Sequence, residues 1–208
     1  MKRDHLVHCF NEFGEPTATT VLPGTGEVLR GDLDINPEQL PQRPLTPAAV
    51  LIGLVDRPAG LSLILTRRHD DLSHHAGQVS FPGGRMEAHD TTLLDAALRE
   101  SQEEIGLAPE RVEVIGRLDD YVTRSGFRIA PFVGLITPPV ELIACPREVA
   151  EIFEVPLVYL FDPVNHKTEA RRENSVSRRF YAMYYNDHRI WGATAGMIYN
   201  LYEFVNQT

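Results

Sequence analysis

Cysteine is scarce in this chain of 208 residues, where Cys9 and Cys145 are the only two. Two isolated cysteines form neither the disulfide framework of a small secreted protein nor the paired ligands of a zinc site. Long apolar runs are absent too, because nowhere do about 18 apolar residues follow one another, as a membrane-spanning helix requires. The first residues, MKRDHLVHCF, contain no apolar segment of a signal peptide. We therefore expect a cytoplasmic protein with no membrane partner.

Basic residues are outnumbered, with 20 Lys and Arg against 29 Asp and Glu and a net charge of −9. This balance argues against nucleic acid as a partner, because binding to a phosphate backbone needs a basic face. The chain is long enough for one domain with a substantial core. We expect a small-molecule ligand, whereas monomer and homodimer both stay open.

The N-terminal part differs in composition from the rest. Residues 4–13 can form a short amphipathic helix, and we favour packing of this helix on the domain over a partner-binding arm. Residues 14–47 are rich in Gly and Pro, which excludes a helix interior or a sheet centre and predicts an extended, wrapping segment. We expect an N-terminal extension over residues 1–46 and the main domain over residues 47–208.

From Ala48 onwards, strands and helices are mixed. The runs AAVLIGLVD and LSLILTR, separated by RPAG, predict two strands of a hairpin that are buried on both faces. The order of the elements shows no strict βαβ repeat, so we expect an α/β fold with helices around a mixed sheet. The other predicted elements are strands Val79–Phe81, Val112–Leu118, Phe127–Ile136, Phe180–Tyr185 and Arg189–Trp191, helices 92–105 and Ala193–Val205, and a short helical turn Glu148–Phe153.

One stretch, GGRMEAHDTTLLDAALRESQEEIGL at residues 83–107, concentrates the chemistry. After two glycines and an acidic loop it enters a helix that carries Glu100, Glu103 and Glu104. At about 100° per residue, these glutamates lie within about 100° of one another on one face. Gly106 is typical of a helix C-cap with positive φ. A different face, which we expect to pack on the core, carries Leu94, Leu98, Ser101 and Ile105.

Three adjacent carboxylates repel one another, and such a group is usually stabilised by a cation. Ligands that are all oxygen favour a hard divalent ion, so we predict that Glu100, Glu103 and Glu104 bind Mg²⁺ or Mn²⁺. The alternative is a solvated helix surface, as most glutamate clusters are. The preceding Gly-Gly turn, the closing Gly-Leu and Arg99, which can pair with Glu103 at i,i+4, favour the metal site.

This stretch resembles the Nudix box, in which a glycine is followed after five residues by a glutamate and after seven more by Arg-Glu-apolar-x-Glu-Glu-x-Gly-apolar. Asp90 replaces the first glutamate, eight residues separate it from Arg99, and Ser101 stands where an apolar residue is usual. These departures make Asp90 a weak candidate for a ligand and leave the helical part of the box intact. The matching positions are Gly84, Asp90, Arg99, Glu100, Glu103, Glu104, Gly106 and Leu107.

The residues before the double glycine, LTRRHDDLSHHAGQVSFPGG, resemble the signature LLTxR…LRxHxGQVxFPGG of the coenzyme A pyrophosphatase branch of Nudix hydrolases. That branch also tends to carry the extra residue in its box. The segments VTRSGFRIAPFVGLI, REVAEIFEVPL and RIWGATAGMI are similar to further parts of it, and together the matches cover most of residues 48–200. The resemblance implies a Nudix-type α/β/α sandwich around a mixed β-sheet.

The resemblance also implies a reaction, the hydrolysis of a pyrophosphate linkage next to a nucleoside. Divalent ions on the three glutamates would shield phosphate charge and lower the pKa of bound water, and one glutamate can act through water instead. Gly83 and Gly84 would let substrate or metal approach closely, because no Cβ intrudes. We count Glu103, Glu151 and Glu148 as catalytic. Glu151 is our first candidate for the general base and Glu148 the second, with a surface role as the alternative for each.

Coenzyme A carries a 3′-phosphate, and a site for it would use arginine forks. His75, in the HxGQV motif, either binds phosphate or braces its loop, and Gln78 of that motif is counted with the substrate-binding residues. A surface salt bridge is the alternative role for each candidate arginine. The candidates flank the branch motifs and are Arg67, Arg68, Arg124 and Arg128.

We therefore expect a metal-dependent hydrolase that cleaves coenzyme A or an acyl derivative into 4′-phosphopantetheine and adenosine 3′,5′-bisphosphate. A Nudix hydrolase for another nucleoside diphosphate derivative, such as NADH or ADP-ribose, is the alternative within the family. An inactive nucleotide-sensing module is the alternative from another class, although such modules usually lose box glutamates that are all present here. The segment around Gly77-Gln78-Val79 favours coenzyme A.

Overall fold

The computed structural model describes residues 1–13, 20–21, 28–32, 34–36, 44–71, 76–173 and 176–206. Most of the segment that we predict to be extended lies outside the described residues, and so does His75. Within that segment the structure shows two short strands, β1 (Thr20–Val21) and β2 (Val28–Gly31). No helix of the described residues is both long and apolar enough to span a bilayer.

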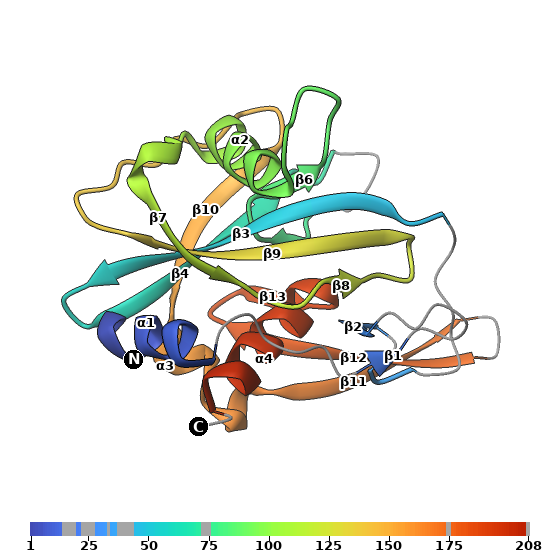
Figure 1. The fold of residues 1–208 in the computed structure, drawn as a ribbon. Helices are drawn as coiled ribbons and strands as arrows, with labels where there is room; N and C mark the ends of the chain where they lie inside the picture. The colour runs from blue at the N-terminus through green and yellow to red at the C-terminus, as the bar shows by residue number, and fades with distance from the viewer. Residues whose placement is uncertain are drawn as a thin grey trace.

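A mixed sheet of ten strands forms the centre of the described part of the chain (Figure 1). Besides β1 and β2 it contains β3 (Thr46–Arg57), β4 (Gly60–Arg68), β5 (Val79–Ser80), β6 (Gly83–Arg85), β7 (Val112–Arg117), β8 (Tyr121–Val122), β9 (Phe127–Ile136) and β10 (Val149–Pro156). The strand order is β1-β2-β8-β9-β3-β4-β10, with β5 on β4, β6 on β3 and β7 on β9. Because β3 is parallel to β9 and antiparallel to β4 and β6, the predicted mixed sheet is confirmed.

The hairpin predicted from the two apolar runs is confirmed as β3 and β4, which turn at Gly60 with φ 119°. Successive residues of β4 face opposite sides of the sheet. Leu63 and Leu65 belong to the larger hydrophobic core, whereas Ile64 packs on the other side with Ile105. Both faces are therefore buried, and this alternation decides which face each later residue of β4 occupies.

Helices cover both faces of the sheet (Figure 1). On one face lies α2 (Leu93–Ile105), and on the other α4 (Ala193–Asn206) packs in the larger core. That core also takes up Leu6, Cys9 and Phe10 of α1 (Arg3–Phe13), so the predicted packing of the N-terminal helix is confirmed. The short helices are α3 (Leu157–Leu160), η1 (Pro109–Arg111) and η2 (Pro163–Asn165).

The buried face of α2 differs in part from our prediction. Ser101 and Ile105 are buried as expected, but Leu94 and Leu98 are only half-buried. Small side chains take their place, because Ala96 and Ala97 pack closely against Ala49 and Ala130 of the sheet. Close approach of helix and sheet leaves no room for leucine there, so the helix is rotated relative to the predicted orientation. This rotation carries Glu104 to the buried side.

A second sheet of three strands lies beyond α4 (Figure 1). Its strands are β11 (Lys167–Glu173), β12 (Val176–Tyr185) and β13 (His188–Trp191), paired antiparallel in that order. The sequence predicts β12 and β13 and does not predict β11, because KTEARRE lacks the apolar alternation of a strand. β11 exists through its pairing with β12.

The helical turn predicted at Glu148–Phe153 is wrong. From Val149 the chain forms strand β10, which pairs antiparallel with β4 at the end of the main sheet. A run of eight residues with glutamates between apolar residues suits a helical turn or an edge strand equally well in sequence. Tertiary pairing decides for the strand.

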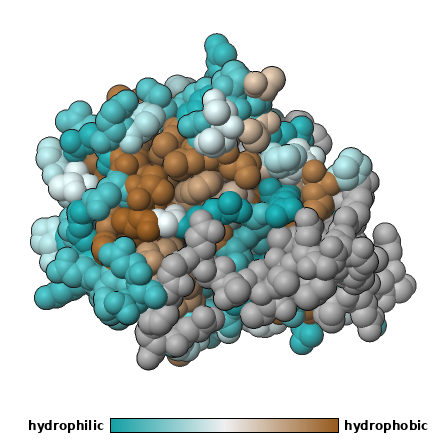
Figure 2. All heavy atoms as spheres, viewed as in Figure 1, coloured by the Kyte–Doolittle hydropathy of each residue, from teal (hydrophilic) through white to brown (hydrophobic). Residues whose placement is uncertain are grey.

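Hydrophobic side chains gather over β7 on the face seen in Figure 2, and hydrophilic side chains surround them. Val112, Val114 and Ile115 of this strand are half-buried. β7 therefore lies at the rim of the core, in contrast to the fully buried centres of β3 and β4.

Candidate functional site

Helix α2 is fixed at both ends by residues close to it in sequence. Thr92 is the N-cap: its side chain accepts a hydrogen bond from Asp95 N, and the Asp95 carboxylate accepts one from Thr92 N. At the other end Gly106 adopts φ 68°, and its N–H donates to Gln102 O. The predicted C-cap is therefore confirmed. These caps set the rotation of the helix and thereby the directions of its three glutamates.

Glu104 is the most buried of the three glutamates, with 4% of its side chain exposed. Gly83 N donates to Glu104 Oε2 at 3.2 Å, and Arg68 Nη1 lies 3.6 Å from Oε1. Burial above all, together with the charges of Glu100 and Glu148, raises the pKa of this carboxyl to about 8, whereas the Gly83 N–H and Arg68 act to lower it. Glu104 is thus a buried carboxylate with two acidic neighbours.

Glu100 lies directly over the Gly-Gly turn. A Cβ on Gly84 would come within 2.5 Å of the Glu100 carboxyl carbon, so any other residue there would displace this carboxylate. Gly83 has φ 153°, and a Cβ there would meet the backbone of Ala49. Burial also raises the pKa of Glu100, although Arg99 opposes the shift. The two glycines therefore bring backbone and carboxylates together.

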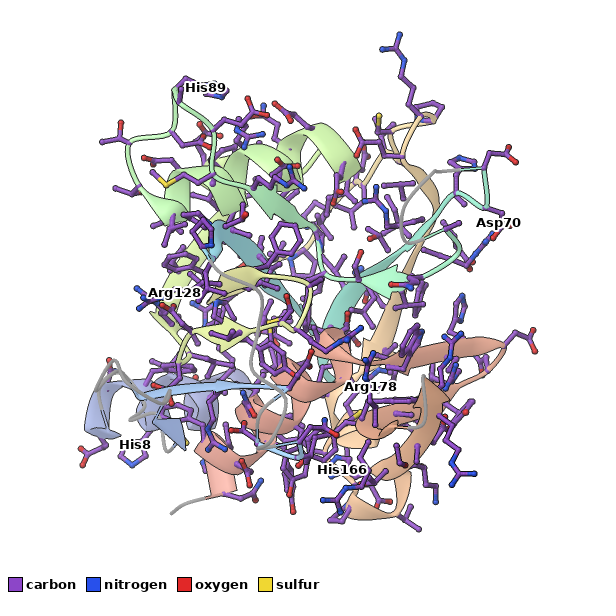
Figure 3. All side chains as sticks on the ribbon, turned by 90° about the vertical axis from the view of Figure 1, so that its right-hand side faces the viewer. His8, Asp70, His89, Arg128, His166 and Arg178 are labelled. Atoms are coloured by element: carbon purple, nitrogen blue, oxygen red, sulfur yellow. The ribbon has the colours of Figure 1, made fainter. Side chains whose placement is uncertain are left out.

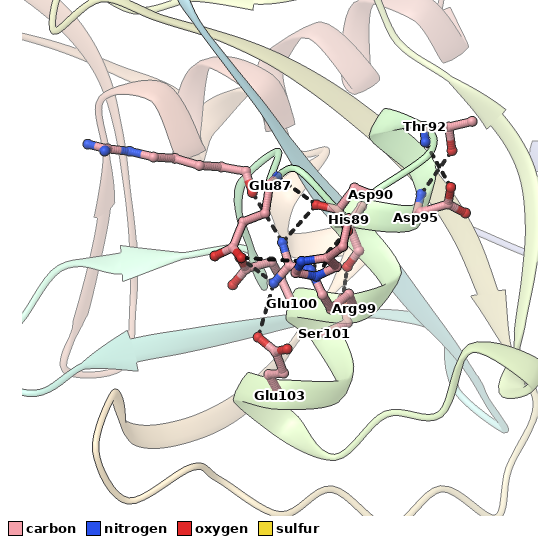
Figure 4. A network of polar contacts seen from close by, with 11 residues as sticks. Glu87, His89, Asp90, Thr92, Asp95, Arg99, Glu100, Ser101 and Glu103 are labelled. Carbon is pink, nitrogen blue, oxygen red and sulfur yellow. Dashed lines mark hydrogen bonds and ion pairs between the residues drawn. The ribbon is translucent and has the colours of Figure 1, made fainter.

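Arg99 joins the acidic loop to the helix (Figure 4). Its Nε and Nη2 each lie 3.0 Å from an oxygen of Asp90, and Nη1 donates to Glu100 at 2.9 Å and to Glu103 at 3.0 Å. The predicted i,i+4 pair with Glu103 is therefore confirmed. Asp90 is 2% exposed and faces the guanidinium in a bidentate pair, which lowers its pKa to about 2. Asp90 thus anchors Arg99.

We expect Asp90→Asn to lower the free energy of unfolding by about 2–3 kcal/mol at neutral pH, because Arg99 loses a charged, bidentate partner. The pKa of Asp90 is lowered in the folded state to about 2. The contribution of Asp90 to the free energy of unfolding is therefore fully present above the pKa of the unfolded state, which is about 4. The contribution is lost as the pH falls towards about 2. Urea unfolding of both proteins at several pH values tests this. A difference in stability that grows at low pH would contradict it.

The two candidates for the general base occupy different places. The Glu148 charge contributes to the raised pKa of both Glu100 and Glu104, behind burial as the largest cause. Its backbone is tied to α2 through Cys145, whose O accepts from Glu148 N and whose N donates to Glu104 O. Glu151 is bound instead to His188 and Arg67, with His188 Nε2 3.1 Å from Oε2. The structure therefore ties the backbone of Glu148 to that of Glu104 through Cys145 and leaves Glu151 with other partners.

The four candidate arginines are also separated. Arg68 shares the α2 face of β4 with Ile64 and reaches Glu104, whereas Arg67 points to the opposite face. Arg128 pairs with Asp120, with its Nε 2.5 Å from Oδ2, and Arg124 N donates to Asp32. Arg67 forms an ion pair with Asp70. Figure 3 shows Asp70 and Arg128 on opposite sides of the molecule. Gln78 O accepts from Arg68 N, so Gln78 lies beside Arg68.

The chemistry of the site suits a divalent cation. Among the described residues no three acidic, histidine or cysteine side chains already surround one point as a metal cage. Arg99 holds Glu100 and Glu103, and Glu103 is 60% exposed, so its carboxylate can turn at little cost. Burial, and to a smaller extent neighbouring negative charge, raises the pKa of Glu100 and Glu104, and a bound cation would favour their ionised forms. All the donors are oxygen atoms, as hard ions prefer.

Comparison with known proteins identifies the family. The NUDIX domain model matches residues 44–182. The chain belongs to the Nudix family. It is 37% identical, over 84% of its length and 90% of the relative, to a Pectobacterium atrosepticum protein called "Uncharacterized Nudix hydrolase NudL". A Klebsiella pneumoniae protein of the same name is 42% identical over 74% of this chain and 80% of the relative. A C. elegans Ap4A hydrolase structure has a TM-score of 0.46 and 16% identity, covering 55% of this chain and 82% of that one.

The family match confirms the predicted fold and class of enzyme. This Nudix protein is a hydrolase of a nucleoside diphosphate derivative, and Nudix hydrolases generally require divalent metal ions such as Mg²⁺ or Mn²⁺. The sequence analysis does not predict the bidentate ion pair between Asp90 and Arg99. The signal for it was the departure from the Nudix box at Asp90, where aspartate replaces glutamate and one extra residue precedes Arg99. The sequence analysis also missed His188, which no sequence signal connects with Glu151.

Proposed function

We propose that this Nudix hydrolase cleaves the pyrophosphate bond of coenzyme A or an acyl derivative. The products are 4′-phosphopantetheine and adenosine 3′,5′-bisphosphate. One observation carries the proposal: Arg68, from the segment that resembles the coenzyme A branch, lies against Glu104 of the Nudix box. The branch segment and the box therefore form one site. Nudix hydrolysis of NADH or ADP-ribose is the alternative.

We assign Glu100, Glu103 and Glu104 as the ligands of the divalent ion. A bound Mg²⁺ or Mn²⁺ supplies charge neutralisation on the phosphates and a lowered pKa for a coordinated water. The protein positions these ligands through the caps of α2, the Gly83 N–H on Glu104 and the Arg99 contacts to Glu100 and Glu103. Arg99 keeps two of the carboxylates near each other despite their repulsion.

We assign Glu148 as the general base, reversing the order expected from the sequence. Its carboxylate takes the proton from the water that attacks one phosphorus of the pyrophosphate, and the bond from that phosphorus to the bridging oxygen breaks. Glu148 suits this role because its backbone is tied through Cys145 to Glu104, its charge acts on both Glu100 and Glu104, and its side chain is exposed to solvent. Glu151 lacks this geometry, since it is held by His188 and Arg67.

We assign Arg68 to the substrate phosphates, because it is the candidate arginine that reaches the box glutamates. Gln78 lies beside it through its backbone, and Gly83 and Gly84 stay candidates for close approach to the substrate on the motif alone. For His75 the proposed contact rests on the motif alone. Arg67, Arg124 and Arg128 have other partners and stay weaker candidates for the 3′-phosphate.

Product analysis tests the substrate. The purified protein is incubated with Mg²⁺ or Mn²⁺ and with coenzyme A, NADH or ADP-ribose, and the products are separated by chromatography. We expect adenosine 3′,5′-bisphosphate from coenzyme A well before the other compounds are cleaved. Cleavage of NADH or ADP-ribose alone would leave the metal site standing and remove coenzyme A as the substrate. Tight binding without cleavage would contradict the proposed reaction.

A further inference from the structure

His188 connects the second sheet with the strand that leads into the site. It belongs to β13, and its ring stacks on Phe153 of β10 with centroids 3.7 Å apart and planes at 14°. His188 Nε2 lies 3.1 Å from Glu151 Oε2, and the pKa of Glu151 is lowered chiefly by this bond. An ionised carboxylate only accepts hydrogen bonds, so Nε2 is the donor. The side chain of His188 is 14% exposed. Two residues of β10 hold it, Phe153 through its ring and Glu151 through its carboxylate.

The two side chains that His188 contacts are consecutive on one face of β10. Phe153 packs in the larger core, whereas its neighbour Ile152 packs on the α2 side. Glu151 therefore shares the face of Phe153, turned away from α2. On β4, Arg67 shares that face and adds a contact to Glu151 at 3.5 Å. His188 thus fixes the start of β10 from the side opposite to the box glutamates.

The start of β10 contains a bulge. Val149 pairs with Arg68 and Glu151 pairs with Arg67, so Ala150 is an extra residue in the strand. Through this bulge Val149 faces α2 together with Arg68. A shift of register by one residue turns the neighbouring side chains to the other face. Such a shift would also displace Glu148, which precedes Val149 and whose O accepts from His69 N.

We propose that His188 is a positioning residue, which holds the bulge of β10 and thereby keeps Glu148 in place beside Glu100 and Glu104. This proposal rests on the proposed role of Glu148 in the hydrolysis. His188 does not touch the site, and it acts through Glu151 and Phe153. Its N–H on Glu151 fixes one residue of the strand, and its ring on Phe153 fixes the next residue on that face.

His188→Phe tests the proposal, because phenylalanine keeps the ring on Phe153 and removes the donor to Glu151. We expect kcat to fall about 10- to 100-fold, with KM within about threefold, since small displacements of a catalytic group have effects of this size. His188→Gln restores an amide donor and is expected to recover most of the loss. The matched control is His166→Phe, a half-buried histidine packed on Tyr199 and Tyr202 away from the site.

Amide hydrogen exchange gives a readout without substrate. The N–H groups of Glu148 and Val149 both donate to Cys145 O, and we expect them to exchange at least about tenfold faster in His188→Phe than in His166→Phe. Equal exchange in the two variants would overturn the positioning role. Faster exchange with an unchanged kcat would overturn it as well, because the bulge would then not control catalysis. If the wild-type protein cleaves none of the compounds, the proposed function fails, and the exchange comparison still decides whether His188 holds the bulge.

Discussion

Glu104→Gln is expected to lower kcat at least about 100-fold, because a metal ligand contributes several kcal/mol to stabilisation of the transition state. Glutamine keeps the shape of the side chain and an oxygen that accepts from Gly83 N, so the fold should be retained. The variant removes one negative charge from a buried group of carboxylates. Activity is measured against coenzyme A over a range of Mn²⁺ concentrations. We expect half-maximal activation to need more metal than in the wild type.

The matched control is Glu110→Gln, which removes the same charge from η1 just after the box helix. It should retain wild-type kcat and metal activation. Wild-type activity of Glu104→Gln, with circular dichroism showing an intact fold, would remove Glu104 from the proposed ligands. If a higher Mn²⁺ concentration restores the activity of Glu104→Gln fully, the variant lowers only the affinity for the metal. That result would contradict the expected fall in kcat.

Glu148→Gln is expected to lower kcat by about 10²- to 10⁴-fold, the range of a general base. Unlike Glu104→Gln, it should leave the metal concentration for half-maximal activation unchanged. The physical reason is that Glu148 lies in the turn before β10, tied through Cys145 to Glu104, and is proposed to take a proton from water, whereas the metal is assigned to α2. Steady-state kinetics at saturating Mn²⁺ measures the effect.

Glu141→Gln is the control for this second variant, because Glu141 is exposed in the same connection between β9 and β10. It should behave as wild type. Glu151→Gln separates the two candidates for the base: we expect a smaller fall in kcat than for Glu148→Gln, since Glu151 faces His188. If Glu151→Gln proves the more damaging of the two, the assignment of the base returns to Glu151.

The box helix could be predicted because its signals are local. The Thr92 side chain accepts a hydrogen bond from Asp95 N three residues away and caps the helix. Arg99 pairs with Glu103 four residues away, and Gly106 ends the helix with positive φ. The hairpin of β3 and β4 was equally accessible, since apolar runs on either side of a turn indicate paired strands. Features encoded within one or two turns of chain need no knowledge of the fold.

The relation between Glu148 and Glu151 could not be predicted for the opposite reason. It depends on a bulge in the pairing of β10 with β4, between residues far apart in the chain. Without that pairing, Glu148–Phe153 suits a helical turn, and the sequence alone does not separate the roles of Glu148 and Glu151. The same holds for the rotation of α2: Leu94 and Leu98 look like its core face until Ala49 and Ala130 bring the sheet too close for them. Long-range packing decided both cases.

The contact between Gly84 and Glu100 has a consequence for the evolution of this protein. A library that samples all amino acids at position 84 is expected to be dominated by glycine among active clones, because even alanine places a methyl group where the Glu100 carboxylate lies. A second change that shortens residue 100 would make room and remove a box glutamate in the same step. The residues that position 84 tolerates therefore depend on the side chain at position 100, and we expect the two positions not to vary independently.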